Sequence, residues 1–346
     1  MTQVTGENGF QRVLVICTDA DDHTGLKHAA MMCDAAKRDG REPPIIEVLS
    51  VVEPQPGEDF IQALGGASLD RLEDMRRDDR RGHVAQALLD VGLPDTTPVT
   101  IVSGKEFVEV IQRSLEVDAD LVIKPAAQVN GLHAHIFGST DLHLLRKCPC
   151  PVWVVRPFRD AGPGDRNGPK PPATPLVVAA MDFDRDADAT GDTSQDALNG
   201  SIVAAAVSIA HASGAALIFV HAWQAPAEGL LQRAAPGVSS SELAQYVREV
   251  ERWHHAALDT FVGAARRDAG MKVSHMSSAL LQGDADEAIA RYVNERRPIA
   301  LVMGTIGRTG IPGVIIGNTA EDILIAIDGS VLAVKPPGFE SPIHLD

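Results

Sequence analysis

The sequence contains one pattern twice, and this repeat restricts the possible folds more than any other feature. One copy begins at Phe137 and reads FGSTDLHLLRKCPCPVWVVRP, and the other begins at Ile316 and reads IGNTAEDILIAIDGSVLAVKP. At a constant offset of 179 residues, Gly138 coincides with Gly317, and a threonine, a leucine, a valine and the closing proline also coincide. Such self-similarity is typical of a duplicated structural unit.

The chain around each copy alternates short apolar runs with longer helical stretches. The first half opens with RVLVICTD from Arg12 and the second with LVVAAMD from Leu176, runs typical of strands that a parallel sheet buries on both faces. The expected helices cover residues 24–38, 69–89, 105–115, 194–212, 240–267 and 284–294, with an N-cap for the fifth at residues 239–241. The other expected strands cover residues 44–51, 98–102, 120–123, 152–155, 215–221, 272–275, 299–303 and 331–334.

A segment rich in proline and glycine, DAGPGDRNGPKPPATP from Asp160, separates the halves. We therefore predict a first domain over residues 11–158, a linker over 159–175 and a second domain over 176–338. Strands that alternate with helices require crossovers, which produce a parallel sheet covered on both faces. The predicted fold class is α/β, with a five-stranded parallel sheet in each domain. Such sheets bind ligands beyond the carboxyl ends of their strands.

The composition excludes several partners. The 346 residues include 47 Asp or Glu and 31 Lys or Arg, a formal net charge of −16, which disfavours nucleic acid and anionic membranes. No apolar run reaches the roughly 20 residues of a membrane span, and no signal peptide opens the chain, so we expect a cytosolic protein. The four cysteines are too few for a disulfide scaffold. Cys148-Pro149-Cys150 lacks the spacing of a redox or zinc motif and is interpreted as two small residues at a helix-to-strand turn.

One loop carries the chemistry that stands out. The strand that ends at Met303 continues as GTIGRTGIPGVIIGNT, in which Gly304 and Gly307 precede Gly317 at a helix start. Glycines allow close approach of a ligand, and a helix N-terminus accepts a phosphate. The Asn318 amide and the Thr319 hydroxyl add hydrogen-bonding groups. The alternative is a glycine-rich turn that only reverses the chain; a Walker P-loop is excluded because its lysine is absent.

Two tandem halves with a G-x2-G-x9-G loop after a fourth strand resemble the universal stress protein family, and in particular its tandem E-type members from Gram-negative bacteria. The resemblance covers both halves and implies adenine nucleotide alpha-hydrolase-like domains in a stress-response protein. It further implies that the fifth strands, residues 152–155 and 331–334, pair within the chain or that their edges form a homodimer.

The resemblance also implies a nucleotide site in the second half, for ATP or a related adenine nucleotide with Mg2+. Asp182 would be the acid at the end of the first strand, although a loop or helix-capping acid is the alternative. Backbone at Val220 would lie near adenine. The phosphates would lie against Gly304, Gly307, Gly317, Asn318 and Thr319.

The first half departs from this pattern. Lys124 and Pro125 stand where the first glycine belongs, and only Gly138, Ser139 and Thr140 remain of the loop. We therefore expect no ATP binding of the usual kind in this half, although Asp19 is kept. Lys124 is expected to be solvated; pairing with an acid or contact with another anionic ligand is the alternative.

No catalytic or metal-binding group emerges from the sequence. No nucleophile and base, metal triad or pair of acids stands out. His133, His135 and His143 lack acid or cysteine partners at fixed spacing, and the acidic stretch over residues 182–192 does not match a calcium loop. We expect those acids to overhang the Gly304 loop, where they would hold Mg2+ or repel phosphates. Two other functions stay open: a nucleotide-independent interaction module, and a lipid or small-molecule site in the first half.

Overall fold

The computed structural model describes residues 9–18, 23–53, 67–126, 137–156, 174–183, 194–225, 239–269, 273, 275–305 and 316–345. The first half contains β1 (Arg12–Ile16), α1 (Thr24–Arg38), β2 (Ile45–Val52), α3 (Ala67–Val91), β3 (Val99–Ser103), α4 (Glu106–Glu116), β4 (Leu121–Pro125), α5 (Ser139–Lys147) and β5 (Val152–Val155). The second contains β6 (Leu176–Ala180), α7 (Ser194–Ser213), β7 (Ala216–Trp223), α9 (Ser240–Ala269), β8 (Met276–Gln282), α10 (Ala285–Arg296), β9 (Ala300–Gly304), α11 (Asn318–Ala326) and β10 (Val331–Val334).

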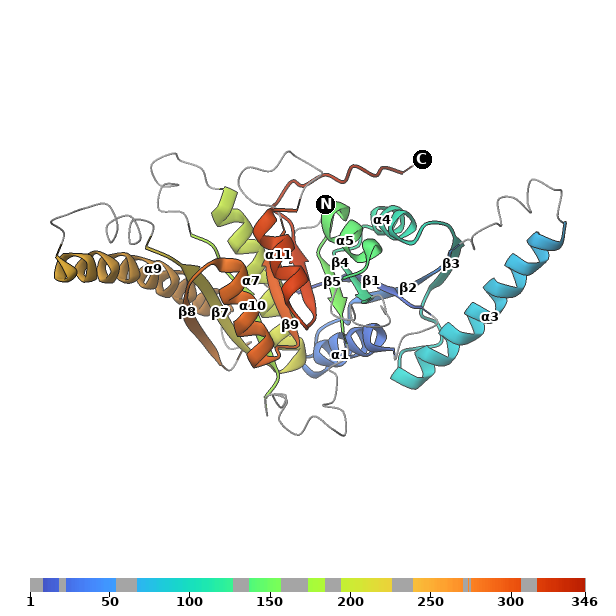
Figure 1. Ribbon diagram of the computed structural model, residues 1–346. Coiled ribbons are helices and arrows are strands. Elements are labelled where there is room, and N and C mark those ends of the chain that lie inside the picture. The colour runs from blue at the N-terminus through green and yellow to red at the C-terminus, as the bar shows by residue number, and fades with distance from the viewer. Residues whose placement is uncertain are drawn as a thin grey trace, which may run out of the picture.

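All of these strands belong to one ten-stranded sheet in the order β3-β2-β1-β4-β5-β10-β9-β6-β7-β8 (Figure 1). Pairing is parallel within each half, which confirms the predicted α/β class. At the centre β5 and β10 pair antiparallel, with Trp153 opposite Leu332. The predicted pairing of the fifth strands within one chain is therefore confirmed. Because corresponding strands lie at equal distances from this junction, an approximate two-fold axis relates the halves.

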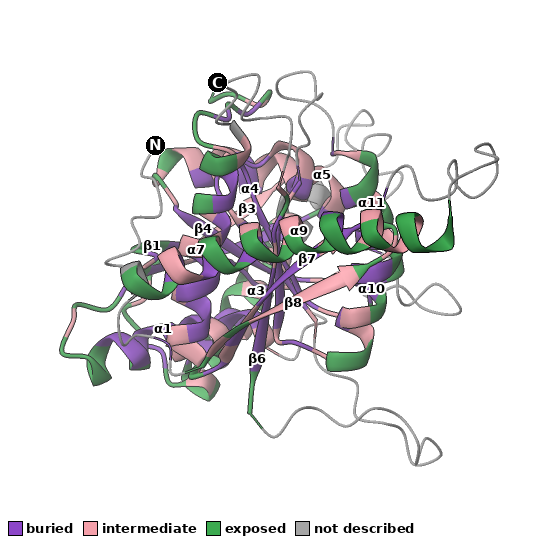
Figure 2. Cartoon of the chain, turned by 90° about the vertical axis from the view of Figure 1, so that its left-hand side faces the viewer, coloured by how far each residue is buried: buried purple, intermediate pink, exposed green. Residues whose placement is uncertain are grey.

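The core consists of two apolar clusters, one on each face of the sheet. On one face α1, α3, α7 and α9 cover strand residues such as Val13 and Val302. On the other face α4, α5, α10 and α11 cover residues such as Leu14 and Leu301. The buried strands lie between helices whose outer surfaces are exposed (Figure 2). Each cluster draws residues from both halves, so the core continues across the junction.

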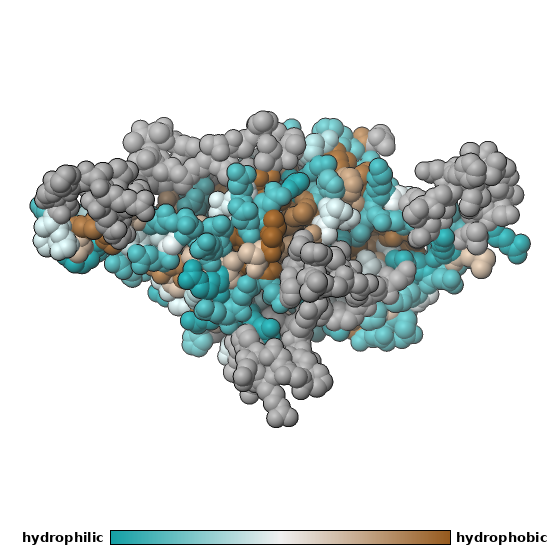
Figure 3. Space-filling model, viewed as in Figure 1, coloured by the Kyte–Doolittle hydropathy of each residue, from teal (hydrophilic) through white to brown (hydrophobic). Residues whose placement is uncertain are grey.

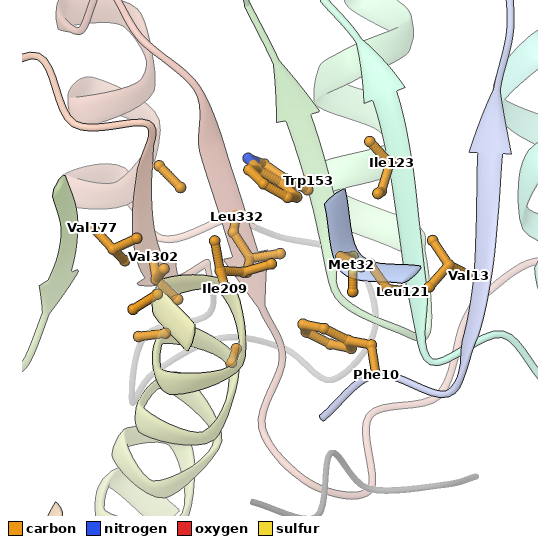
Figure 4. Packing of buried hydrophobic residues seen from close by; sticks show 14 of the residues in the cluster. Phe10, Val13, Met32, Leu121, Ile123, Trp153, Val177, Ile209, Val302 and Leu332 are labelled. Atoms are coloured by element: carbon orange, nitrogen blue, oxygen red, sulfur yellow. The ribbon is translucent and has the colours of Figure 1, made fainter. Parts of the chain in front are cut away.

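Trp153 is the largest fully buried side chain and lies at this junction. In Figure 4 it lies beside Leu332 of the second half, with Ile209 of α7 and Met32 of α1 on the same face of the sheet. Outside the junction, Asp39 contacts His211 at 2.5 Å and Arg146 contacts Glu321 at 2.6 Å. Packing of α1 against α7 on one face and the α5–α11 ion pair on the other thus bind the halves on both sides of the sheet.

The basic residues that end the repeats cross this junction reciprocally. The Lys335 ammonium, after β10, donates to the Leu145 carbonyl in the last turn of α5. The Arg156 guanidinium, after β5, donates to the Ile327 carbonyl at the end of α11, at 3.4 Å. A cation near a helix C-terminus interacts favourably with the helix dipole. Each half therefore stabilises a helix end in the other.

The expected boundaries lie within two residues of most described ones, with one clear error. The third strand of the second half was predicted over residues 272–275, but β8 begins at Met276. This strand is a sheet edge and its residues are half-exposed, so it lacks the apolar run that marks a strand buried on both faces. The predicted cap of α9 is confirmed: the Glu242 amide donates to Ser239 Oγ at 3.2 Å, and the Ser239 amide donates to the Glu242 carboxylate at 2.8 Å.

Candidate functional site

The strands β6, β7 and β9 end at the same edge of the sheet, next to the start of α11. Of the predicted site residues, Asp182, Val220, Gly304, Gly317, Asn318 and Thr319 lie in the described part of the chain, and Gly307 lies outside it. The acidic residues 184–192, Asp19, His133 and His135 also lie outside the described residues, as does most of the predicted linker. The two domain boundaries therefore stay predictions.

Asp182 follows β6, and its side chain is exposed at this edge. Its backbone is held by the buried side chain of Asn199 on α7, whose amide donates to the Asp182 carbonyl at 2.7 Å and accepts from the Asp182 amide at 3.4 Å. Gln195 donates to the same Asn199 oxygen at 3.3 Å. The sequence interpretation missed Asn199, although an asparagine inside the apolar run of this helix was a usable signal.

Val220 lies within β7 rather than at its end, because the strand continues to Trp223. Its side chain is fully buried, and its carbonyl accepts from the Met181 amide at 2.8 Å. The backbone that emerges at this edge of β7 is therefore that of Trp223 and the residues after it. That Val220 lies near adenine stays a prediction.

A buried histidine supports the ends of β6 and β7 from behind. His221 Nδ1 lies 3.0 Å from the Met181 carbonyl, which only accepts, so this nitrogen carries the proton. His221 Nε2 is then the acceptor for His254 Nδ1 of α9, at 2.8 Å. Phe183 packs edge-on against the His221 ring at 4.9 Å. Burial lowers the pKa of His221, so the ring stays neutral and acts as a fixed spacer.

The glycine at the end of β9 has a packing reason. A Cβ on Gly304 would come within 2.7 Å of Leu198 Cδ2 on α7, so this glycine allows the helix to approach the strand end closely. The next residue, Thr305, accepts the Gly317 amide at 3.0 Å. This bond places Gly317, at the start of α11, beside the end of β9.

The N-terminus of α11 faces this edge and has no carboxylate at its N-cap or at its first three positions; Glu321, at the fourth, pairs with Arg146 of α5 at 2.6 Å. Gly317 is the N-cap residue and makes no side-chain capping bond. Asn318 and Thr319 are exposed, and the third helical position is Ala320. The first amides of a helix have no intrahelical acceptor and carry partial positive charge. This arrangement is suited to an anionic group such as a phosphate.

The corresponding place in the first half is filled by charged residues of the chain itself. Asp141 occupies the third position of α5, and its carboxylate accepts the Gly138 amide at 3.2 Å. Lys124 Nζ lies 2.8 Å from Asp141 Oδ1 and 3.5 Å from Glu106 Oε1, and its side chain is only 2% exposed. The expectation of a solvated Lys124 was therefore wrong, and pairing with an acid is confirmed. The sequence did not show the cluster because Glu106, Lys124 and Asp141 lie on three different elements.

Electrostatics fit the geometry of this cluster. Desolvation alone would lower the pKa of Lys124, but the charges of Asp141 and Glu106 outweigh it, and the pKa is raised. Burial raises the pKa of Glu106. At the offset of 179 residues, the three positions are Ala285, Met303 and Ala320 in the second half. At this place the first half carries an internal ion pair, whereas the equivalent residues of the second half are apolar.

Two further properties bear on the class of protein. Among the described residues, no three His, Cys, Asp or Glu side chains are grouped as metal ligands. His143 is instead stacked on Phe107 at 4.5 Å. No helix in the described ranges is long and apolar enough to span a membrane. On the face that Figure 3 shows, most of the described residues are hydrophilic, and apolar residues gather near the middle of the view.

Comparison with known proteins identifies the family to which this duplicated α/β fold belongs. The model of the universal stress protein family matches residues 9–156 and 192–335, and the chain belongs to this family. Universal stress protein E of Escherichia coli K12 is 28% identical over 267 residues, covering 76% of this chain and 75% of the relative. Universal stress protein E of Photorhabdus laumondii is 25% identical over 243 residues, covering 69% of each. The resemblance to tandem universal stress proteins is confirmed.

Solved structures agree on the fold. A functionally unknown protein from Pseudomonas aeruginosa PAO1 has a TM-score of 0.58 and 20% identity, covering 94% of this chain and 93% of its own. A protein from P. aeruginosa UCBPP-PA14 that is described as a universal stress protein has a TM-score of 0.57 and 22% identity, covering 94% of both chains. The tandem arrangement thus recurs over nearly the whole length of these chains.

Proposed function

We propose that this stress protein binds ATP or a related adenine nucleotide with its second half, in a non-catalytic role. The observation that carries the proposal is the contrast between the two helix starts. An internal carboxylate occupies the start of α5, whereas the start of α11 has an alanine, Ala320, at the same position. An anionic phosphate supplies at α11 what Asp141 supplies at α5.

The residues around α11 fit this role. Gly317 lets a phosphate approach the first amides closely, and the exposed Asn318 and Thr319 offer an amide and a hydroxyl. Asp182 lies at the same edge, and in this proposal it faces the ribose or a Mg2+ that bridges it to the phosphates. The net charge of −16 makes such a cation important, because it offsets repulsion between acidic residues and the triphosphate.

The substitution Ala320→Asp tests the proposal by giving α11 the carboxylate that α5 carries. We expect it to weaken ATP binding at least about tenfold, because an internal carboxylate competes for the same amides and repels phosphate. Isothermal titration calorimetry of the full chain with ATP and MgCl2 measures the effect. Ile325→Asp is the matched control, since it adds the same charge near the other end of the same helix, at a side chain that is 49% exposed.

Three outcomes decide the question. Binding that Ala320→Asp weakens and Ile325→Asp does not supports a phosphate at the N-terminus of α11. Equal loss in both variants indicates a charge effect and contradicts the site. No heat and no thermal shift of the unmodified chain at millimolar ATP would favour an interaction module that needs no nucleotide.

A further inference from the structure

Two cysteine thiols lie in contact at the turn between α5 and β5. Cys148 Sγ and Cys150 Sγ are 3.6 Å apart, and both side chains are buried. Both are free thiols. The sequence spacing suggested only small residues at a turn, and neither the family fold nor the proposed nucleotide site uses them. A separation of 3.6 Å leaves a short movement to the bonding distance of about 2.05 Å.

The surroundings favour one thiolate in this pair. Cys148 Sγ lies 3.9 Å from Ser114 Oγ, and Lys335 lies close enough for its charge to act on it. Although burial opposes it, hydrogen bonds from Cys150 and Ser114 and the Lys335 charge lower the pKa of Cys148. The described carboxylates form no ion pair with Lys335, and burial lowers its pKa to about 7. A thiolate is the nucleophilic form of cysteine.

A cavity of about 300 Å3 opens onto Cys150 of the pair. Cys150 and Lys335 line it together with Pro149 and Phe339, and residues of α4 and α7 complete the wall. Its position follows from the antiparallel junction, since β5 begins where β10 ends. A small polar oxidant such as hydrogen peroxide fits this volume and reaches Cys150 first, because Cys150 is 8% exposed and Cys148 is fully buried.

We propose that Cys148 and Cys150 are a redox modification site that hydrogen peroxide converts to a disulfide, with Lys335 as the charged group that assists the reaction. The hydrogen bond to Cys148 and burial raise the pKa of Cys150 well above its ordinary value, so the Cys148 thiolate acts as the base: it accepts the Cys150 proton as the Cys150 sulfur attacks one peroxide oxygen. The O–O bond breaks, Cys150 becomes a sulfenic acid, and the departing hydroxide takes the Cys148 proton to form water.

The second step closes the bond. The Cys148 thiolate attacks the Cys150 sulfur, the S–S bond forms and the S–O bond breaks. The hydroxide that leaves takes a proton from the Lys335 ammonium and becomes water. In total, two thiol sulfurs are oxidised, one peroxide is reduced, and two waters are released.

Peptide mass spectrometry tests the proposal, because trypsin places the pair in one peptide. Cleavage after Lys147 and Arg159 releases CPCPVWVVRPFR, since the bond between Arg156 and Pro157 resists trypsin. The native chain is treated with hydrogen peroxide, quenched with catalase, and then denatured in an alkylating agent. We expect this peptide to lose the mass of two hydrogen atoms and to escape alkylation, while the peptides with Cys17 and Cys33 become alkylated.

Several results would overturn the proposal. These are an unchanged peptide, oxygen atoms added without loss of two hydrogens, or oxidation of Cys33 at the same rate as the pair. Burial raises the pKa of Cys33, so it serves as an internal comparison within the same sample. In Cys150→Ser the disulfide cannot form, and a peptide mass still reduced by two hydrogens would show that the assignment is wrong.

The variant Lys335→Met tests whether the lysine charge speeds the oxidation, or whether the closeness of the two thiols is sufficient. Loss of the ammonium raises the pKa of the pair, which slows peroxide oxidation by about threefold for each pKa unit because thiolate fraction and nucleophilicity change in opposite directions. Arg156→Met is the matched control, since Arg156 occupies the equivalent position in the repeat and contacts the other helix end. Equal rates in the two variants would overturn the role of Lys335.

Discussion

Lys335 and Arg156 occupy equivalent positions in the two halves, but they differ in how deeply they are buried. Both follow a fifth strand and donate to a helix end in the other half. Arg156 reaches a half-buried place over the Phe137 ring at 4.1 Å, whereas Lys335 is almost fully buried. Burial of an ammonium without a carboxylate partner disfavours its charged form. The stability of the protein therefore depends on the proton of this one lysine.

The dependence has a definite sign. The pKa of Lys335 is about 7 in the folded chain, against an ordinary value of 10.5. Between these values the unfolded state binds more protons than the folded state, so the free energy of unfolding rises with pH. In Lys335→Met this contribution is absent. Urea denaturation measures the free energy of unfolding of both proteins between pH 7 and pH 10. We expect the value for the variant minus the value for the unmodified chain to fall as the pH rises. A constant difference would contradict the burial of the charge.

At the scale of elements, α4, β4 and α5 meet in the first half through the charges of Glu106, Lys124 and Asp141, and the corresponding elements of the second half meet through apolar residues. The same packing position is therefore held by charged residues in one half and by apolar residues in the other. A buried ion pair contributes little net stability compared with apolar residues of similar size, but breaking one partner leaves an uncompensated charge. The second half supplies the natural replacement for each residue.

This comparison predicts strongly non-additive effects. Lys124→Met alone should lower the free energy of unfolding by about 3–5 kcal/mol, because Asp141 and Glu106 are left without their cation. The triple variant Glu106→Ala, Lys124→Met and Asp141→Ala copies the second half and should regain most of that loss. Urea denaturation of both variants measures the coupling. A triple variant less stable than the single one would show that the ion pair itself holds the first half together.

At the scale of the whole molecule, two apolar clusters run through both halves, and one sheet joins them. The inner edges of both five-stranded halves are occupied by β5 and β10, so a homodimer of this chain would need a different surface. A core shared in this way links the unfolding of one half to that of the other, in contrast to two domains on a linker.

The three tryptophans make this testable. Trp153→Phe leaves Trp223 and Trp253, which report on the second half; the double variant Trp223→Phe, Trp253→Phe leaves Trp153, which reports on the junction. We expect the fluorescence of each variant to change at the same urea concentration as its own circular dichroism, because the halves unfold as one unit. Separate midpoints for fluorescence and circular dichroism would mean that the halves unfold independently.

The features predictable from the sequence are those in which local pattern and tertiary burial agree. The repeat and the apolar runs at Arg12 and Leu176 led to the element order, because strands buried on both faces are apolar throughout. The pattern failed at β8, an exposed sheet edge, and at Lys124, whose partners are distant in sequence. For the site, the helix start at Gly317 was predictable, but the packing role of Gly304 against Leu198 needs tertiary structure. The contact of Val220 with adenine, and the other ligand contacts, stay predictions.

The antiparallel junction of β5 and β10 places the strand ends of the two halves on opposite sides of the molecule. The start of β5, with its thiols, consequently lies at the same side as the carboxyl ends of β6, β7 and β9. At the offset of the repeat, Cys148 and Cys150 correspond to Ile327 and Gly329, so only one copy has this pair. Two identical subunits would carry every change twice. Covalent fusion lets one copy carry the thiol pair and the other the proposed phosphate site, a difference between halves that two identical subunits cannot have.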